Sequence, residues 1–90
     1  MKLILCKHCQ DIVRPYPRQV RTCHCGDVKV ECLNDLDVIV TATEEWAVPI
    51  GFNNHSFVRA VCNQPNEGMG KDFTAFVIPK KCSTIIWNFR

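Results

Sequence analysis

Cys6-Lys7-His8-Cys9 and Cys23-His24-Cys25-Gly26 are the two stretches of this 90-residue chain that decide its fold. Each stretch contains a close pair of cysteines, and 13 residues separate the two pairs. A tetrahedral zinc ion is bound by four such sulfurs when each pair arrives on its own tight turn. Residues two apart in an extended segment point to the same side, so Cys23 and Cys25 can share one ion while His24 points away. We therefore predict a Zn²⁺ site formed by Cys6, Cys9, Cys23 and Cys25.

The sequence leaves alternatives open for the identity of the ion and for one of its four ligands. Iron also suits a tetrahedron of sulfurs, and His8 or His24 could replace one thiolate. In each version the protein supplies four ligands, whereas a catalytic zinc keeps one position open for water or substrate. We therefore expect a structural metal and no enzyme activity.

The composition is that of one small folded domain. Hydrophobic residues form 47% of the chain, which argues against disorder, and a core this small often depends on a bound metal. The apolar run Leu3–Leu5 is too short for a secretory signal, and no stretch approaches the ~20 apolar residues of a membrane span. We expect a cytoplasmic protein with no membrane partner, in which the cysteines are thiols or metal ligands.

Short strands are expected on both sides of the second cysteine pair. Residues 28–32 alternate between apolar and charged side chains, which predicts a half-buried strand, and residues 38–40 follow after a turn as its possible hairpin partner. Residues 44–54 are predicted to be irregular because Pro49 and Gly51 disfavour regular structure. The remaining strands are expected at 2–5, 19–22, 73–78 and 85–89.

One helix is expected from about His55 to Asn63, capped by Asn53 or Asn54. Its inward stripe would contain Phe57, Val58, Val61 and Cys62. These elements predict an α+β fold, in which an N-terminal zinc ribbon is fused to a small antiparallel sheet with one helix. Residues 1–90 would form a single domain, in which the ribbon (1–32) and the sheet with its helix (33–90) share one core.

Basic side chains are concentrated in residues 1–30, which carry six of them against two acids. In a nucleic-acid-binding protein, arginines would hold phosphates and Tyr16 would stack on a base. Four thiolates with one zinc ion add a charge of −2, so the chain falls from a formal +2 to about neutral and loses attraction for phosphates. Binding to another protein is therefore our first hypothesis, and nucleic-acid binding is the alternative.

Aromatic and arginine side chains dominate protein–protein binding energies, and two segments supply them. They are the irregular segment 44–55 and the loop from Arg14 to Arg21. The candidate partner-binding residues are Arg14, Tyr16, Arg18, Arg21, Trp46 and Phe52. The sequence carries no signal for an oligomeric state.

A small redox or cysteine-dependent enzyme is the third hypothesis. Cys82 follows Lys80 and Lys81, which could lower the pKa of its thiol and make it reactive. Cys32 and Cys62 lie on apolar faces of their predicted elements, so we expect both to pack in the core as small hydrophobic residues.

Two stretches also support a resemblance to known proteins. Cys6 through Gly26 resembles zinc-ribbon proteins broadly, although its second cysteine pair has one intervening residue where two are usual. The stretch Ile50-Gly-Phe-Asn-Asn-His-Ser-Phe-Val-Arg-Ala60, together with Phe73-Thr-Ala-Phe-Val-Ile-Pro79, is similar to a group of short uncharacterised bacterial and phage proteins. The resemblance implies a small prokaryotic or phage accessory protein, and proteins of this kind often act by binding a host protein.

Overall fold

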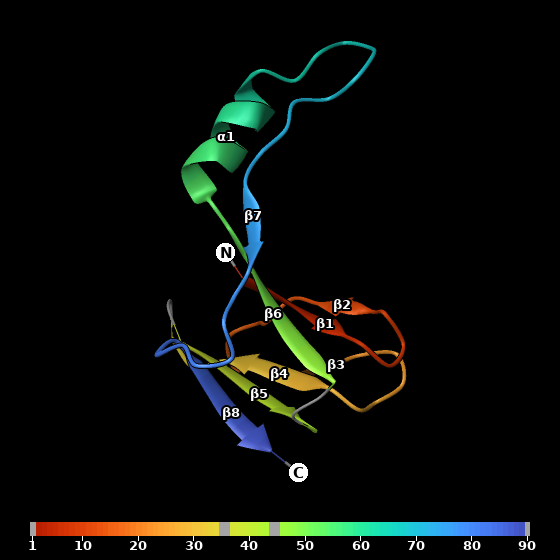
Figure 1. The fold of residues 1–90 in the computed structure, drawn as a ribbon, viewed down its shortest axis with the longest axis vertical. Coiled ribbons are helices and arrows are strands. Elements are labelled where there is room, and N and C mark those ends of the chain that lie inside the picture. Colours follow the sequence, from red (N-terminus) through yellow and green to blue (C-terminus); the bar gives the residue numbers. More distant parts are fainter. Residues whose placement is uncertain (1, 35–36, 44–45, 90) are drawn as a thin grey trace.

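A computed structural model describes residues 2–34, 37–43 and 46–89, which form two four-stranded sheets and one helix (Figure 1). The α+β class predicted from the sequence is therefore confirmed. The helix is α1 (Asn54–Cys62). The first sheet has the strand order β2 (Ile12–Val13), β1 (Lys2–Cys6), β6 (Ala47–Phe52) and β7 (Ala75–Val77). The second has the order β3 (Arg21–Thr22), β4 (Lys29–Cys32), β5 (Val38–Ala42) and β8 (Ile85–Phe89).

The second sheet contains the hairpin that the alternating pattern predicted. β4 and β5 pair antiparallel, with Glu31 opposite Ile39. β8 then joins β5 in parallel, with Val40 opposite Trp87. A parallel pair needs a long connection between its strands, and here the connection includes β6, α1 and β7. The sequence predicted a ribbon fused to a small antiparallel sheet, whereas the described strands form two four-stranded sheets, one of which contains the parallel β5–β8 pair.

The prediction that residues 44–54 are irregular is wrong for β6, which pairs antiparallel with β1 from Ala47 to Gly51. Residues 44 and 45 lie outside the described part of the chain. The Pro49 carbonyl accepts a hydrogen bond from the Ile78 N–H (2.9 Å), just beyond the end of β7. The nitrogen and carbonyl of one strand residue face the same neighbour. The nitrogen of Pro49, which carries no hydrogen, therefore points toward the β7 side, where the pairing of β6 with β7 has already ended. The proline thus removes no hydrogen bond between β6 and β1.

Gly51 allows β6 and β7 to approach each other closely. It lies opposite Phe76, and a Cβ at position 51 would be only 2.6 Å from the Phe76 ring. The aromatic ring therefore occupies the space that a side chain would need. A glycine that disfavours regular structure in the sequence thus has a packing role within a strand.

The hydrophobic core combines residues from both sheets and from both halves of the chain. Ile4 of β1 and Val30 and Val40 of the second sheet are almost completely buried, as is Val28 before β4. The rings of Trp46 and Trp87 pack against this cluster. Cys32, expected in the core, is only half-buried, and its thiol donates to the Asn34 carbonyl at 3.4 Å.

α1, residues 63–74 and β7 form a projection that we call the arm (Figure 1). β7 joins the arm to the first sheet, and α1 with residues 63–74 extends away from both sheets. Asn53 caps α1, since its Oδ1 accepts from the Ser56 N–H at 2.9 Å. The helix contains no buried residue, so the prediction of an inward stripe is wrong, and Cys62 is exposed. In place of a buried core, the rings of Phe52, Phe57 and Phe73 pack against one another in stacked or edge-on pairs.

Among the residues that the structure describes, no helix is both long enough and apolar enough to cross a membrane.

Candidate metal centre

The first cysteine turn connects β1 to β2. Cys6 is the last residue of β1, and the Gln10 N–H donates to the Cys6 carbonyl at 2.7 Å, which closes the turn. Gln10 has a positive φ of 62°, in the left-handed region that reverses the chain direction. The turn therefore places the Cys6 and Cys9 side chains together before the chain returns along β2.

The second cysteine turn connects β3 to β4 in the other sheet. The Gly26 N–H donates to the Cys23 carbonyl at 3.1 Å, and Gly26 has a φ of 85°, which a glycine adopts without steric cost. The Val28 N–H donates to the Cys23 sulfur at 3.3 Å. Such a bond stabilises a thiolate and fixes its orientation, as expected around a metal ligand.

The four predicted sulfurs converge. The Cys6 and Cys25 sulfurs are 3.7 Å apart, those of Cys23 and Cys25 are 3.5 Å apart, and all four Sγ atoms, including that of Cys9, lie within 4.8 Å of one another. Zn–S bonds of about 2.3 Å in a regular tetrahedron would put the sulfurs about 3.8 Å apart. All seven cysteines are free thiols. The cluster can therefore hold a metal ion, as the cysteine spacing predicted.

An ion at this place would join the two sheets. Cys6 and Cys9 belong to the β1–β2 turn in the first sheet, and Cys23 and Cys25 belong to the β3–β4 turn in the second. Cys6 and Cys23 are buried and contribute to the core. Binding of an ion here would thus be coupled to the packing of the two sheets at one point of the fold.

Asp11 connects the two cysteine turns, and the sequence analysis missed it. Its Oδ2 accepts from the His24 N–H and its Oδ1 from the Ile12 N–H, both at 2.9 Å. Its carbonyl accepts from the Cys6 N–H, also at 2.9 Å. No periodicity or motif marks this aspartate, because its role arises from a contact between residues 13 positions apart.

The thiols differ in how readily they lose a proton. Burial raises the pKa of Cys6. For Cys9, burial raises the pKa, but hydrogen bonds from the backbone of Asp11 and Cys25 outweigh burial and lower the pKa to about 6. For Cys25, a backbone hydrogen bond from Asp27 lowers the pKa, while burial and the neighbouring thiols raise it to about 12. Cys9 therefore loses its proton more readily than Cys6 and Cys25, and a bound divalent cation would favour the thiolate form of its ligands.

His8 provides a second possible ligand set beside the four sulfurs. Its Nδ1 lies within hydrogen-bonding distance of Asp27 Oδ2, at 2.5 Å, and the His8, Cys25 and Asp27 ligand atoms also lie within 4.8 Å of one another. The His8 ring contacts Trp46, with ring centroids 4.9 Å apart. His8 and Asp27 are more exposed than Cys6 and Cys23, which places the His8 set on the outside of the cluster.

We expect the variant His8→Ala to retain about one zinc ion per chain, because the four thiolates complete the coordination shell. The free energy of unfolding should change by no more than about 0.5 kcal/mol, as is usual for an exposed side chain. Cobalt substitution checks the ligands, because the thiolate charge-transfer bands should be the same as in the unaltered protein. His24→Ala is the matched control. A change in these bands in His8→Ala alone would make His8 a ligand.

The candidate partner-binding residues lie in separate places. The guanidinium groups of Arg14 and Arg21 lie 5.1 and 4.9 Å from the centre of the Tyr16 ring. Arg18 is exposed at the tip of the same loop, with a φ of 60°. Trp46 directly precedes β6 and Phe52 ends it, so the strand separates these two rings. The structure brings Arg14, Tyr16 and Arg21 together, and Phe52 instead packs against Phe57 and Phe73.

Cys82, half-buried between β7 and β8, is not part of the four-cysteine cluster. Hydrogen bonds from the side chain and backbone of Thr84 lower the pKa of its thiol. The side-chain hydrogen-bond partner that the structure shows for the Cys82 sulfur is the Thr84 hydroxyl, at 3.3 Å, and not a histidine.

Searches of protein-family models, of curated proteins and of solved structures return no match to this chain. The residues of the cluster and the surfaces around it are therefore the basis for the proposals that follow.

Proposed function

We propose that this chain is a zinc-ribbon module, in which a structural zinc ion joins the two sheets, and that it acts by binding another protein. Two adjacent β-hairpins each present one cysteine pair, which supports the zinc-ribbon assignment. The four thiolates would complete the coordination shell of the ion, so the site offers no position for a substrate. The metal would therefore stabilise the fold and would not take part in catalysis.

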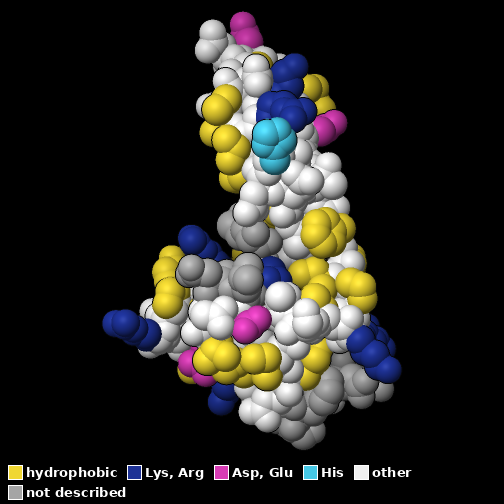
Figure 2. Space-filling view, turned by 90° about the vertical axis from the view of Figure 1, so that its left-hand side faces the viewer, with side chains coloured by type: hydrophobic (Ala, Val, Ile, Leu, Met, Phe, Trp, Pro, Cys, Tyr) yellow, Lys and Arg dark blue, Asp and Glu magenta, His cyan; other side chains and the backbone are white. Residues whose placement is uncertain are grey.

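The single observation that carries the binding function is the exposed apolar surface of the arm. Figure 2 shows hydrophobic side chains along one edge of this projection. Over all its faces together, the arm exposes the large apolar residues Val58, Val61, Met69, Phe73, Phe76 and Val77. The arm adds nothing to the buried core, since α1 contributes no buried residue. Exposed apolar side chains that gather on one edge favour an interaction site, and an amphipathic helix typically lies in a hydrophobic groove of its partner.

The partner we propose is a protein that offers such a groove to the arm. If the chain is a bacterial or phage accessory protein, as its resemblance implies, the groove belongs to a host protein. Phe52, at the end of β6, is the one aromatic residue of the original candidate set that packs against rings of the arm, those of Phe57 and Phe73. It would therefore support the arm at its base, while Val61 and Met69 make the contacts with the partner.

Photocrosslinking tests this surface. A photoreactive amino acid at Met69, which is 91% exposed, should capture one specific protein in the cell, whereas the same residue at Val20, which is 54% exposed on the ribbon, should not. Equal capture from both positions would contradict the proposal.

We expect Val61→Lys to weaken binding to the captured and purified protein by at least about tenfold, because a charge would enter an apolar contact. Leu33→Lys is the matched control, because Leu33 and Val61 are both 57% exposed and Leu33 lies outside the arm. Isothermal titration calorimetry measures both affinities. Unchanged affinity in Val61→Lys would exclude the arm as the binding surface.

Nucleic-acid binding remains the second candidate function, and the observation behind it is the cluster of Arg14 and Arg21 around Tyr16. Both guanidinium groups already lie over the tyrosine ring, so a base would have to compete with them for stacking. Binding to single-stranded DNA or RNA that falls steeply with salt would support this candidate. Absence of binding at ~50 mM salt would eliminate it.

A further inference from the structure

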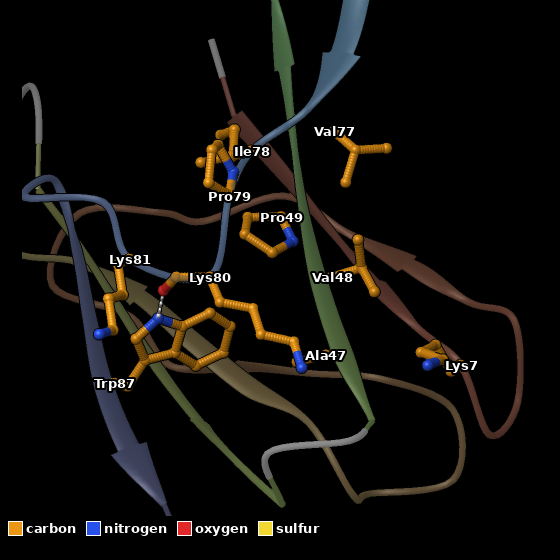
Figure 3. A pocket seen from close by; sticks show the side chains of 10 residues that line it. All are labelled: Lys7, Ala47, Val48, Pro49, Val77, Ile78, Pro79, Lys80, Lys81 and Trp87. Atoms are coloured by element: carbon orange, nitrogen blue, oxygen red, sulfur yellow. Dashed lines mark hydrogen bonds between the residues drawn. The ribbon is translucent and has the colours of Figure 1, made fainter.

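A cleft of about 580 Å³ lies between the two sheets, away from the tip of the arm (Figure 3). Ala47, Val48 and Pro49 of β6 form one wall, the segment 77–81 forms a second, and Trp87 of β8 closes it. Lys7 of the first cysteine turn lies at the rim of the cleft. Its backbone N–H donates to the Trp46 carbonyl at 2.7 Å. The volume is in the range of small-molecule sites.

The walls of this cleft are apolar, and its charged groups have one sign. Lys7, Lys80 and Lys81 are its charged lining residues, and no acidic residue is among the described residues that line it. Figure 3 shows the Lys80 and Lys81 side chains beside the Trp87 indole. The Trp87 Nε1–H donates to the Lys80 carbonyl at 2.8 Å, which holds the lysine segment against the aromatic ring. An apolar cavity with a few convergent polar groups is the usual form of a ligand site.

We propose that this cleft binds a small organic anion with an apolar body, such as an acyl or aryl carboxylate. The hydrocarbon part would lie against Val48, Pro49 and Trp87, and its carboxylate would face Lys80 and Lys81. Charge complementarity selects an anion, because a cation would meet three ammonium groups without a carboxylate among the described lining residues. The proposal does not depend on protein binding by the arm, because Val77 alone among the described lining residues belongs to both surfaces, and the variants that test each surface are at other positions.

The test uses three probes of equal chain length and different charge: octanoate, octan-1-ol and octylamine. The readout is the indole N–H signal of Trp87 in NMR spectra of the unaltered, zinc-loaded protein. The chain has two tryptophans, so comparison with Trp46→Phe assigns the signal. We expect octanoate to shift the Trp87 signal saturably, with an affinity at least about fivefold above that of the alcohol and the amine. Equal shifts by all three probes, or no saturable shift at millimolar octanoate, would overturn the proposal.

Two sets of variants locate the anion. Lys80→Gln combined with Lys81→Gln should weaken octanoate binding about fivefold and leave octanol binding unchanged. Lys71→Gln, in the arm, is the matched control and should bind octanoate normally. These lysines are exposed, so the variants are expected to fold, which the NMR spectrum itself verifies. Unchanged octanoate affinity in the double variant would overturn the assignment of the anion to Lys80 and Lys81. Displacement of octanoate by an acidic peptide, at a peptide concentration below that of octanoate, would overturn the assignment of a small organic anion as the ligand.

Discussion

Removal of zinc from the protein is expected to unfold both sheets and not only the two turns that hold the ion. The turns belong to different sheets, and the buried Cys6 and Cys23 are part of the shared core. Zinc binding in small zinc peptides contributes roughly 10–16 kcal/mol, whereas whole domains are stable by about 5–15 kcal/mol. The metal-free chain should therefore lose its β-sheet circular dichroism and the dispersion of its NMR spectrum. Addition of zinc should restore both.

The control for this experiment is magnesium, which prefers oxygen ligands and should not restore the fold. A chelator that removes zinc while the NMR spectrum and the thermal transition remain unchanged would contradict the expectation. That outcome would mean that the core between the sheets is sufficient without the ion. The cysteine cluster would then have another role.

Replacement of a buried ligand should have the second largest effect. In Cys23→Ser, zinc loses a thiolate, and the sulfur that accepts from the Val28 N–H is also lost. Cys23 is only 4% exposed, so water cannot easily replace it. We expect the free energy of unfolding of the zinc-loaded protein to fall by about 4 kcal/mol or more, in the range caused by loss of a metal site. Chemical denaturation at saturating zinc measures it.

Cys62→Ser is the matched control, because it makes the same chemical change at an exposed position on α1. Its free energy of unfolding should change by no more than about 0.5 kcal/mol, and its zinc content should not change. If Cys23→Ser were as stable as Cys62→Ser, Cys23 could not be a ligand that the fold requires.

Local patterns in the sequence predicted the parts of the structure that depend on neighbouring residues. The spacing of Cys6, Cys9, Cys23 and Cys25 identified the cluster before the structure placed their sulfurs together. The alternation in 28–32 predicted β4 and its hairpin with β5. The cap at Asn53 and the helix that follows it were also found, with bounds one residue from those observed.

Contacts between distant segments could not be read in the same way. Pro49 disfavours a strand by itself, yet it fits β6 because β7 ends beside it. The parallel pairing of β5 with β8 depends on residues almost 50 positions apart, and no local pattern encodes it. The apolar stripe of α1 predicted a helix packed on the core, but the structure leaves it without buried residues. Periodicity shows that a helix has an apolar face, and it does not show whether the same chain covers that face. The cleft beside Trp87 likewise combines four separate stretches of the sequence.

X-ray absorption at the zinc edge, on protein purified without added metal, tests the central claim most directly. If the two sheets are joined by a structural ion, the spectrum should show zinc with four sulfur neighbours at about 2.3 Å and no nitrogen or oxygen in the first shell. A protein that is folded but contains no zinc, or zinc with fewer than four sulfur neighbours, would contradict the claim.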